Sequence, residues 1–546
     1  MKRFTLYLLA SLLATSLQAQ VANLSMNPII EAQYLDTLYL KTNTHSSIRP
    51  FLVKDIGGYN TLKYFMPLIT DSRSWNKFLN AQFFPFNIQG YKLQINPIFT
   101  TEIGPVYTLA VDYEKDRKLK VQDLQLGFEA KANINPNLAF CFDFIFQNWT
   151  SPEYQRPRID STHVIPQTGI YKNGDSFGYA AYYWQGHLSY SPLPYLNFQI
   201  GKEKHFLGDG YRSLFYSDNA PSQPYISATV EVGKIKYQFM VSQNTGYNGA
   251  VPSERFSTKY ITTHYLSYNA TKWLNLNFFE TVIQQATDTV GHRGYEINYL
   301  NPALFLRPIE FNIGSPDNAL LGMGYKINLS PHYQIYGQFL LDELIVSNLL
   351  SNNGWWGNKY AIQFGLKTVE PFKIKGLQVR LEGNMAQPYT YSHGIMSENL
   401  SNLYQPIAHP LGANFVELLS TARLQRGRIG ISYMASYAQK GLDTPGKNYG
   451  GDIFKNYETR TVPDETRYVP EHWEGTEDFG HHLLQGLRTT YIYTEGRFYL
   501  IINPKLRLIG EIGLRSIRSK NIETSTNYTY GFIGIRTLLN RPTDDH

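Results

Sequence analysis

The chain of 546 residues has little of three features that mark common protein classes. It holds one cysteine, Cys141, which excludes an internal disulfide framework and any multi-cysteine metal cluster. Its 50 basic residues are scattered and form no Lys/Arg run, so the sequence predicts no nucleic-acid partner. After residue 20 no apolar stretch is long enough for a transmembrane helix. A membrane-bound form of this protein therefore has to cross the bilayer with strands.

Aromatic residues, by contrast, make up 15% of the chain, with 42 Tyr, 31 Phe and 7 Trp. So much apolar ring surface predicts a folded chain and not a disordered one. Residues 1–19 predict a secretory signal peptide, because Lys2 and Arg3 precede an uncharged stretch and Ala19 offers a small residue at the cleavage point. A membrane anchor would need about 20 apolar residues, which this stretch lacks.

From about residue 88 onward, apolar and polar residues alternate with the period of a β-strand. In residues 121–134 the even positions are mainly apolar, whereas the odd positions carry residues such as Glu129 and Lys131. These runs last about 10–14 residues, whereas strands of soluble proteins last about five or six. A lipid-facing strand needs about nine to eleven residues, apolar outside and polar inside. The sequence therefore predicts an all-β fold, a transmembrane antiparallel β-barrel.

Short turn sequences rich in Pro, Gly and Asn interrupt the alternation, and each joins two predicted strands. They lie at 135–137, 191–194, 233–234, 269–271, 330–331, 370–371, 426–427 and 503–504. With one strand near 90–102 and one near 527–538, the barrel is predicted to have about eighteen strands. The longer polar segments between the hairpins are 150–177, 204–224, 244–259, 285–317, 386–412 and 439–485. Outer-membrane barrels have short turns in the periplasm and long loops outside the cell.

Residues 20–87 differ from the rest, because they mix short apolar runs with helix and strand breakers. Within them Asp71–Phe84 is compatible with one short helix. We expect a signal peptide over 1–19, a small periplasmic N-terminal plug segment over 20–87 and the barrel with long extracellular loops over 88–546. The alternative for residues 20–87 is a small independent subdomain.

The densest group of chemically distinctive residues lies in Gly201–Pro221, where a predicted strand reaches its outer end. Sugar recognition needs flat aromatic faces for C–H surfaces and carboxylate, amide or guanidinium groups for hydroxyls. This segment offers both, and its candidate polysaccharide-binding residues are Lys204, His205, Asp209, Tyr211, Arg212, Asp218 and Asn219. The alternative is a loop folded into the barrel, where Asp209, Arg212 and Asp218 pair with charges of the lumen and constrict it.

Two other aromatic groups add Trp355, Trp356, Tyr391 and His393 to the candidate polysaccharide-binding residues. The two tryptophans equally fit an aromatic girdle at the lipid interface, which barrels of this kind carry.

No catalytic residues, metal or cofactor are predicted, and we do not expect an enzyme. Ser392 and His393 are adjacent, so in an extended chain their side chains point to opposite faces. His481 and His482 are adjacent as well and lack the ligand spacing of a zinc-binding helix.

In residues 201–220, 301–318 and 409–415 the sequence resembles the Bacteroidetes branch of Wzi-type capsule assembly proteins, and also the gliding-motility-associated proteins of the RemB type. The resemblance implies an outer-membrane barrel of about eighteen strands with a helical periplasmic plug. It also implies a non-enzymatic lectin that holds capsular polysaccharide at the cell surface. The chain departs from this pattern in its short N-terminal segment and in Asn540–His546, which lack the aromatic residue that often closes such barrels.

Three functions follow as expectations. The first is a barrel that binds and anchors surface polysaccharide, capsular or exopolysaccharide, with outer-membrane lipid around it. The second is an accessory barrel of the gliding, surface-adhesion or secretion machinery that docks proteins through the acidic and aromatic loop 439–485. The third is a diffusion porin, which an inward loop and a plug would close.

Overall fold

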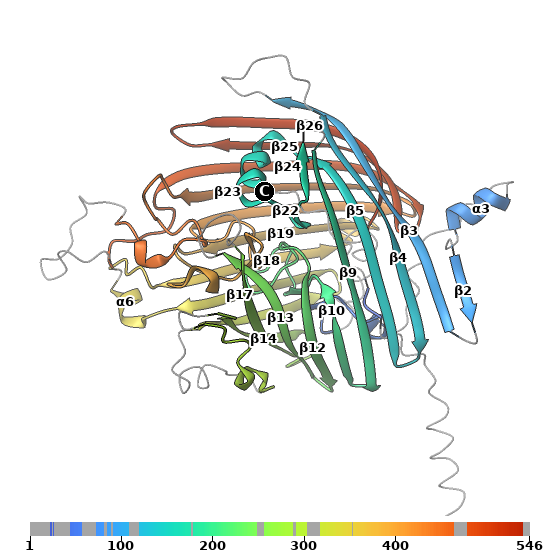
Figure 1. Ribbon diagram of the computed structural model, residues 1–546, viewed down its shortest axis with the longest axis horizontal. Helices are drawn as coiled ribbons and strands as arrows, with labels where there is room; N and C mark the ends of the chain where they lie inside the picture. The colour runs from blue at the N-terminus through green and yellow to red at the C-terminus, as the bar shows by residue number, and fades with distance from the viewer. Residues whose placement is uncertain are drawn as a thin grey trace, which may run out of the picture.

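The computed structural model describes residues 22–24, 26, 44–56, 73–80, 84–88, 91–108, 120–175, 178–247, 256–287, 291–302, 317–351, 353–462 and 478–538. The expected signal peptide and Asn540–His546 lie outside these residues. Strands dominate the described chain (Figure 1). Among its helices, none combines the length and the apolar composition needed to span a membrane.

Eighteen strands of the described chain close into one antiparallel barrel, which confirms the predicted fold class and strand number. The barrel closes where β26 pairs with β3, with Ile533 opposite Ile103. The strands are β3 (Tyr91–Thr108), β4 (Lys120–Asn135), β5 (Leu138–Thr150), β9 (Gly178–Leu193), β10 (Leu196–Glu203), β12 (Gln223–Val232), β13 (Ile235–Tyr247), β14 (Phe256–Tyr268), β15 (Leu274–Gln285), β16 (Asn318–Ser330), β17 (Tyr333–Glu343), β18 (Lys359–Val369), β19 (Leu377–Ala386), β22 (Phe415–Arg426), β23 (Ile429–Leu442), β24 (Leu487–Asn503), β25 (Leu508–Lys520) and β26 (Ser525–Thr537).

The smaller elements sit at the two ends of the barrel, inside it or at its edge. They are β1 (Ile48–Arg49), η1 (Val53–Ile56), α3 (Arg73–Asn80), β2 (Phe84–Ile88), η3 (Glu153–Gln155), α4 (Arg156–Thr162), β6 (Val164–Ile165), β7 (Gly169–Ile170), β8 (Asn173–Asp175), β11 (Phe206–Leu207), η4 (Ile297–Leu300), α6 (Val346–Leu350), η5 (Pro371–Lys373), η6 (Met396–Glu398), β20 (Ser401–Asn402), β21 (Gln405–Pro406) and η7 (Tyr457–Thr459). The helix α3 lies inside the predicted helical stretch Asp71–Phe84.

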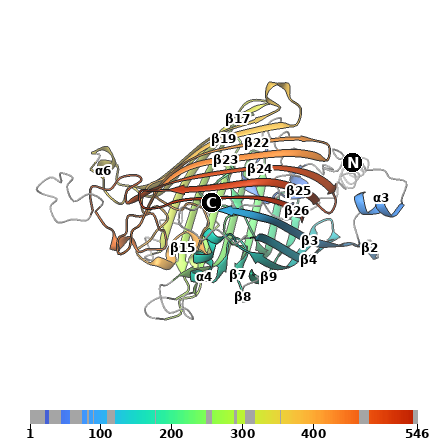
Figure 2. The same ribbon diagram turned by 90° about the horizontal axis from the view of Figure 1, so that it is seen from above.

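All eight predicted short turns join neighbouring strands at one end of the barrel. Gly233 and Gly427 adopt positive φ values of 60° and 56° in two of them, a backbone conformation that glycine adopts at little cost. The longer connections lie at the other end, and Figure 2 shows α6 and α3 at opposite ends of the molecule. One long connection, residues 344–358, was not among the six predicted from the sequence.

The predicted alternation places apolar side chains outside the barrel and charged ones inside. On β4 the outward Leu126 and Phe128 are 45% and 42% exposed, whereas Glu129 is 3% exposed. The inward charges pair with one another, as expected for a polar lumen. Arg497 Nη1, for example, lies 3.0 Å from Glu511 Oε2 on the neighbouring strand.

A hydrophobic core fills part of the lumen, where a porin would hold water. It joins wall residues such as Tyr265, Phe279 and Leu340 to residues of the connections 204–222 and 387–414 and of β1. Phe215 stacks on Phe279 with ring centroids 4.8 Å apart. Gly322 on β16 makes room for this ring, because a Cβ atom there would overlap Phe215. The barrel is therefore packed internally by its own chain.

Candidate functional site

Residues 204–222, which hold most of the candidate residues predicted from the sequence, enter the lumen; we call this segment the inner loop. Its flanking strands β10 and β12 have only 8 and 10 residues, and Glu203 pairs with Gln223 where they end. The inner loop then forms β11, which pairs antiparallel with β1 through Ile48 and Leu207. A piece of the N-terminal segment and the inner loop thus form a small sheet of their own.

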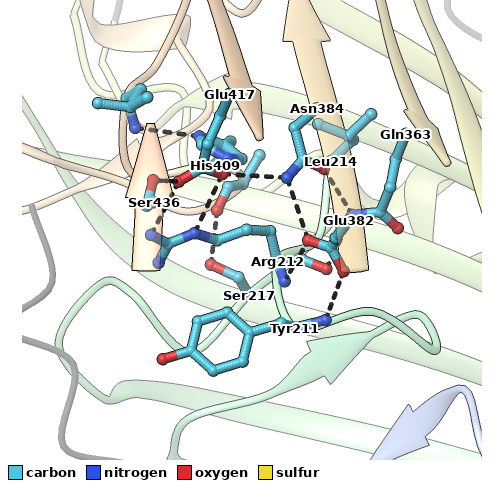
Figure 3. A network of polar contacts seen from close by, with 12 residues as sticks. Tyr211, Arg212, Leu214, Ser217, Gln363, Glu382, Asn384, His409, Glu417 and Ser436 are labelled. Carbon is cyan, nitrogen blue, oxygen red and sulfur yellow. Dashed lines mark hydrogen bonds and ion pairs between the residues drawn. The ribbon is translucent and has the colours of Figure 1, made fainter. Parts of the chain in front are cut away.

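Arg212 anchors the inner loop to two carboxylates of the barrel wall (Figure 3). Its Nη2 donates to Glu417 Oε1 at 3.2 Å, and both side chains are buried. The backbone N–H groups of Tyr211 and Arg212 donate to Glu382 at 2.7 and 3.0 Å. Charge-assisted bonds of this kind are stronger than neutral ones. The buried carboxylate of Glu417 is therefore matched by the guanidinium of Arg212, and that of Glu382 by two backbone N–H donors.

Further donors satisfy the same carboxylates. Glu417 accepts from Ser436 Oγ at 2.8 Å and from Asn384 Nδ2 at 3.0 Å, and His409 Nε2 lies 2.9 Å away. Glu382 accepts from the hydroxyl of Tyr336 at 2.8 Å. Buried polar groups are tolerated when their partners are complete, and this network meets that condition.

The described N-terminal residues 44–49 contact the same loop and the wall. Ser46 Oγ donates to Asp209 Oδ1 at 2.5 Å, and Lys326 Nζ donates to Ser46 Oγ at 2.8 Å. Arg49 Nη2 donates to the carbonyls of Gly208 and Gly210 at 2.9 and 3.2 Å. These contacts suit the plug predicted over 20–87, whose boundaries stay a prediction.

The predicted binding residues of the inner loop are covered by protein. Lys204 Nζ donates to the Asp218 carbonyl at 3.1 Å, and Asn219 Nδ2 donates to the Pro406 carbonyl at 2.9 Å. Tyr211 is half-buried and its hydroxyl lies 3.3 Å from the sulfur of Met434. The inner loop therefore folds into the barrel, as in the alternative that the sequence left open for Asp209, Arg212 and Asp218. The buried members are Lys204, His205, Asp209, Arg212, Asp218 and Asn219.

Three of the other predicted residues, Trp355, Trp356 and His393, meet Tyr457 and Arg460 at the long-loop end, and we call these five residues the outer aromatic cluster. All five are half-buried. The ring of Trp356 lies 6.0 Å from Trp355 and 4.7 Å from Tyr457, and His393 lies edge-on to Tyr457 at 5.8 Å. Three long connections, 344–358, 387–414 and 443–486, supply these residues.

Backbone hydrogen bonds hold the three connections together, and the N–H of Tyr389 joins 387–414 to the Gly450 carbonyl at 3.0 Å. The N–H of Trp356 donates to the Asp478 carbonyl at 2.9 Å, and the N–H of His481 donates to the Gly354 carbonyl at 2.8 Å. Gly354 has a φ of 71°, and a Cβ atom there would come within 2.7 Å of the His481 carbonyl oxygen. Only glycine allows this approach, so the Asn-Gly-Trp-Trp-Gly sequence is a docking point between loops.

Charged groups surround the rings of the cluster. The Arg460 guanidinium lies over Trp356 at 4.7 Å and pairs with Asp478, and Lys359 Nζ lies over Tyr457 at 4.8 Å. Such cation–π contacts help to hold these half-buried rings in one orientation. Below His393, burial raises the pKa of the Glu398 carboxyl above its ordinary value, although the nearby imidazole opposes this shift.

Sequence reasoning found part of this cluster. Trp355, Trp356 and His393 come together, whereas Tyr391 is buried below them and donates its hydroxyl to the Leu214 carbonyl of the inner loop at 2.9 Å. Tyr457 and Arg460 were missed, because their loop was interpreted as an acidic protein-docking surface. Tyr457 and Arg460 are three residues apart around the turn η7, and this spacing could have indicated that their side chains lie close together. Most of the acidic residues of that loop lie in 463–477, outside the described residues.

No protein-family model matches the chain, and no curated protein sequence matches it. Wzi of Escherichia coli, an outer-membrane protein involved in group 1 capsule assembly and described as a carbohydrate-binding β-barrel, matches in structure with a TM-score of 0.53. The identity is 14%, and the match covers 94% of this chain and 99% of that one. Pseudomonas aeruginosa OccK8 (OprE) and Acinetobacter baumannii OccAB4 both have a TM-score of 0.41, with identities of 9% and 7%. These matches cover 82% and 81% of this chain and 98% and 97% of theirs. The chain is an outer-membrane β-barrel with the fold of Wzi.

Proposed function

We propose that this barrel binds a surface polysaccharide, capsular or exopolysaccharide, at its extracellular end and anchors it there without enzymatic chemistry. The outer aromatic cluster is the observation that carries the proposal, because Trp355, Trp356 and Tyr457 meet there from three loops and remain half-buried. The fold shared with Wzi, a carbohydrate-binding barrel, supports it. The narrower resemblance to RemB-type proteins stays a prediction.

The cluster has the chemistry that a sugar chain requires. Each aromatic ring offers a flat apolar face for the C–H face of a pyranose, and Arg460, His393 and Asp478 place donors and acceptors beside the rings. Because ring contacts and backbone bonds hold the cluster in place, ordering it costs little on binding. A polymer presents the same unit many times, so weak contacts to many barrels add up to firm retention.

Binding of the purified, detergent-folded protein to the surface polysaccharide of its own strain tests the proposal. We expect saturable binding that unrelated glycans do not compete for. The double variant W355A/W356A should bind about tenfold more weakly, a change of about 1.4 kcal/mol. The matched control is W273A, whose ring is 53% exposed at the opposite, short-turn end.

Heat-modifiable migration in gels shows that each variant is folded. Full binding by the folded double variant would remove the cluster from the proposal. Absence of binding by the wild type would overturn the polysaccharide function itself.

Docking of surface or secretion-machinery proteins is the second candidate, and it rests on the acidic and aromatic composition of 439–485. Cross-linking on whole cells from a residue in that loop separates the two. Recovery of one protein neighbour, together with no polymer binding, would favour docking.

A diffusion porin is the third candidate. The inner loop and β1 pack against the lumen wall, which opposes a wide water-filled path. Single-channel recording in planar bilayers tests this point. A large, steady conductance from the full-length protein would favour the porin.

A further inference from the structure

A polar cavity of about 40 Å³ lies between the barrel wall and the N-terminal residues Asn23 and Leu24. Its wall side carries charges of both signs and the thiol of Cys141, the only cysteine of the chain. The cavity lies well away from the outer aromatic cluster, toward the short-turn ends of β4 and β5. The wall residues that matter here are Glu129, Lys131, Cys141, Asp143 and Arg507.

The register of the sheet brings these residues together. Glu129 on β4 lies directly opposite Asp143 on β5, and Lys131 lies opposite Cys141. Like charges placed directly opposite each other across two strands repel. One ligand atom from each of Glu129, Cys141 and Asp143 lies within 4.8 Å of the other two, and all three residues are buried.

The neighbouring cations pair with Glu129, whereas one oxygen of Asp143 has no hydrogen-bond partner in the described part of the chain. Lys131 Nζ lies 2.7 Å from Glu129 Oε1, Arg507 pairs with the same oxygen, and Asn96 Nδ2 donates to Oε2 at 3.1 Å. Asp143 Oδ2 accepts from Gln185 Nε2 at 2.9 Å, whereas Oδ1 has no hydrogen-bond partner among the described residues. Asp143 is 5% exposed, and an unpaired buried carboxylate oxygen is costly.

We propose that Cys141, Asp143 and Glu129 form a binding site for a thiophilic divalent cation, with Zn²⁺ as the ion that fits. Zinc is bound in proteins by thiolate sulfur and carboxylate oxygen, whereas Ca²⁺ and Mg²⁺ select oxygen ligands alone. On binding, the Cys141 thiol loses its proton to water and its sulfur becomes a ligand. The unpaired Asp143 Oδ1 supplies the second ligand, and a Glu129 oxygen supplies the third.

Lys131 competes with the metal ion for Glu129, and its side chain can move away from this carboxylate. Its side chain is 28% exposed, whereas that of Glu129 is 4% exposed. When the metal binds, the ammonium turns away from Glu129 toward solvent, while Arg507 keeps its contact. The site therefore predicts that removing the Lys131 charge tightens metal binding, an effect that a merely structural ion pair would not show.

Metal content after equilibration with Zn²⁺ and dialysis tests the proposal. We expect about one zinc ion per chain in the wild type, loss in C141S and D143N, and several-fold tighter binding in K131M. The matched control is D123N. It removes another carboxylate of β4, one that accepts from Gln125 and Gln147 and does not line the cavity.

A second measurement needs no variant, because Cys141 is the only thiol. Zn²⁺ should slow its reaction with a maleimide by at least about tenfold, and a chelator should restore the rate, whereas Mg²⁺ should have no effect. Zinc retained by folded C141S, weaker binding in K131M, or no protection of the wild-type thiol would each overturn the site.

Discussion

The inner loop and the outer aromatic cluster have the same kinds of residues but different placements in the barrel. Both combine aromatic rings with charges of both signs, and from the sequence the inner loop and three residues of the outer cluster, Trp355, Trp356 and His393, were candidates for binding sugar. In the inner loop Arg212 is buried and matched by Glu417 of the wall. In the outer cluster Trp355 and Trp356 keep part of their faces open. The composition of a loop therefore does not decide whether it packs inside the barrel or keeps side chains partly open at the rim.

Strand length accompanies this difference for two of the loops, although the tryptophans themselves lie between β17 and β18, with 11 residues each. The inner loop joins β10 and β12, with 8 and 10 residues, whereas β23 and β24, which carry the loop of Tyr457, have 14 and 17 residues. The inner loop, which starts from the two short strands, begins at the depth of the lumen, where its polar groups must find partners in the wall. A loop carried past the rim by long strands can leave side chains open to the outside.

Arg212→Ala is expected to have the largest effect. It leaves Glu417 buried without its cation, which should lower the free energy of unfolding by about 4 kcal/mol. Urea unfolding of the folded barrel, followed by gel migration, measures the change. The exposed Arg518→Ala serves as control. If the refolded R212A variant lost polymer binding while keeping its stability, the inner loop would belong to the binding site after all.

Phe215→Ala should follow, with a loss of about 3 kcal/mol, because the ring is fully buried against Phe279 and its removal leaves a cavity. The same unfolding measurement applies, with Phe372→Ala at an exposed turn as control. Polymer binding should stay at the wild-type level. A loss of stability no larger than that of the control would show that the inner loop is not packed as described.

Arg460→Ala should change binding and not folding. Its guanidinium holds the Trp356 ring and offers donors beside it, so polymer affinity should fall about threefold to fivefold, or about 0.5–1 kcal/mol. The unfolding midpoint should stay within experimental error, because the side chain is half-buried at the surface. Binding isotherms of R460A and R518A give the comparison. Equal affinities would restrict the binding surface to the tryptophans.

The smallest expected effect is a pH dependence of the outer loops. Because burial raises the pKa of Glu398 in the folded state, the folded loop binds more protons than the unfolded loop above pH 4.5, the ordinary value. Its contribution to stability is therefore largest at low pH and is lost as pH rises through the folded-state pKa. Limited proteolysis of loop 387–414 should be slower at pH 5 than at pH 7, after correction for protease activity on an unfolded substrate. E398Q should lose this slope, and an unchanged slope would assign it to another group.

Much of the architecture was predictable because it depends on local rules. Alternation of period two located the strands, and Pro, Gly and Asn located all eight short turns. The connection 344–358 was missed, since its apolar residues in α6 hide it among the strands. Of the proposed binding surface, the tryptophans were visible as a rare dipeptide. Their contact with Tyr457, about a hundred residues further along the chain, was not.

The sequence alone determined the strand pattern, the turn positions and the sidedness of the barrel wall, because each depends on neighbours within a few residues. The tertiary structure decided which loops enter the lumen, which rings meet at the rim, and that Glu129, Cys141 and Asp143 converge. These outcomes depend on register across the sheet and on the pairing of buried charges between distant segments. Such pairings are set by the closed barrel as a whole, and no window of the sequence contains them.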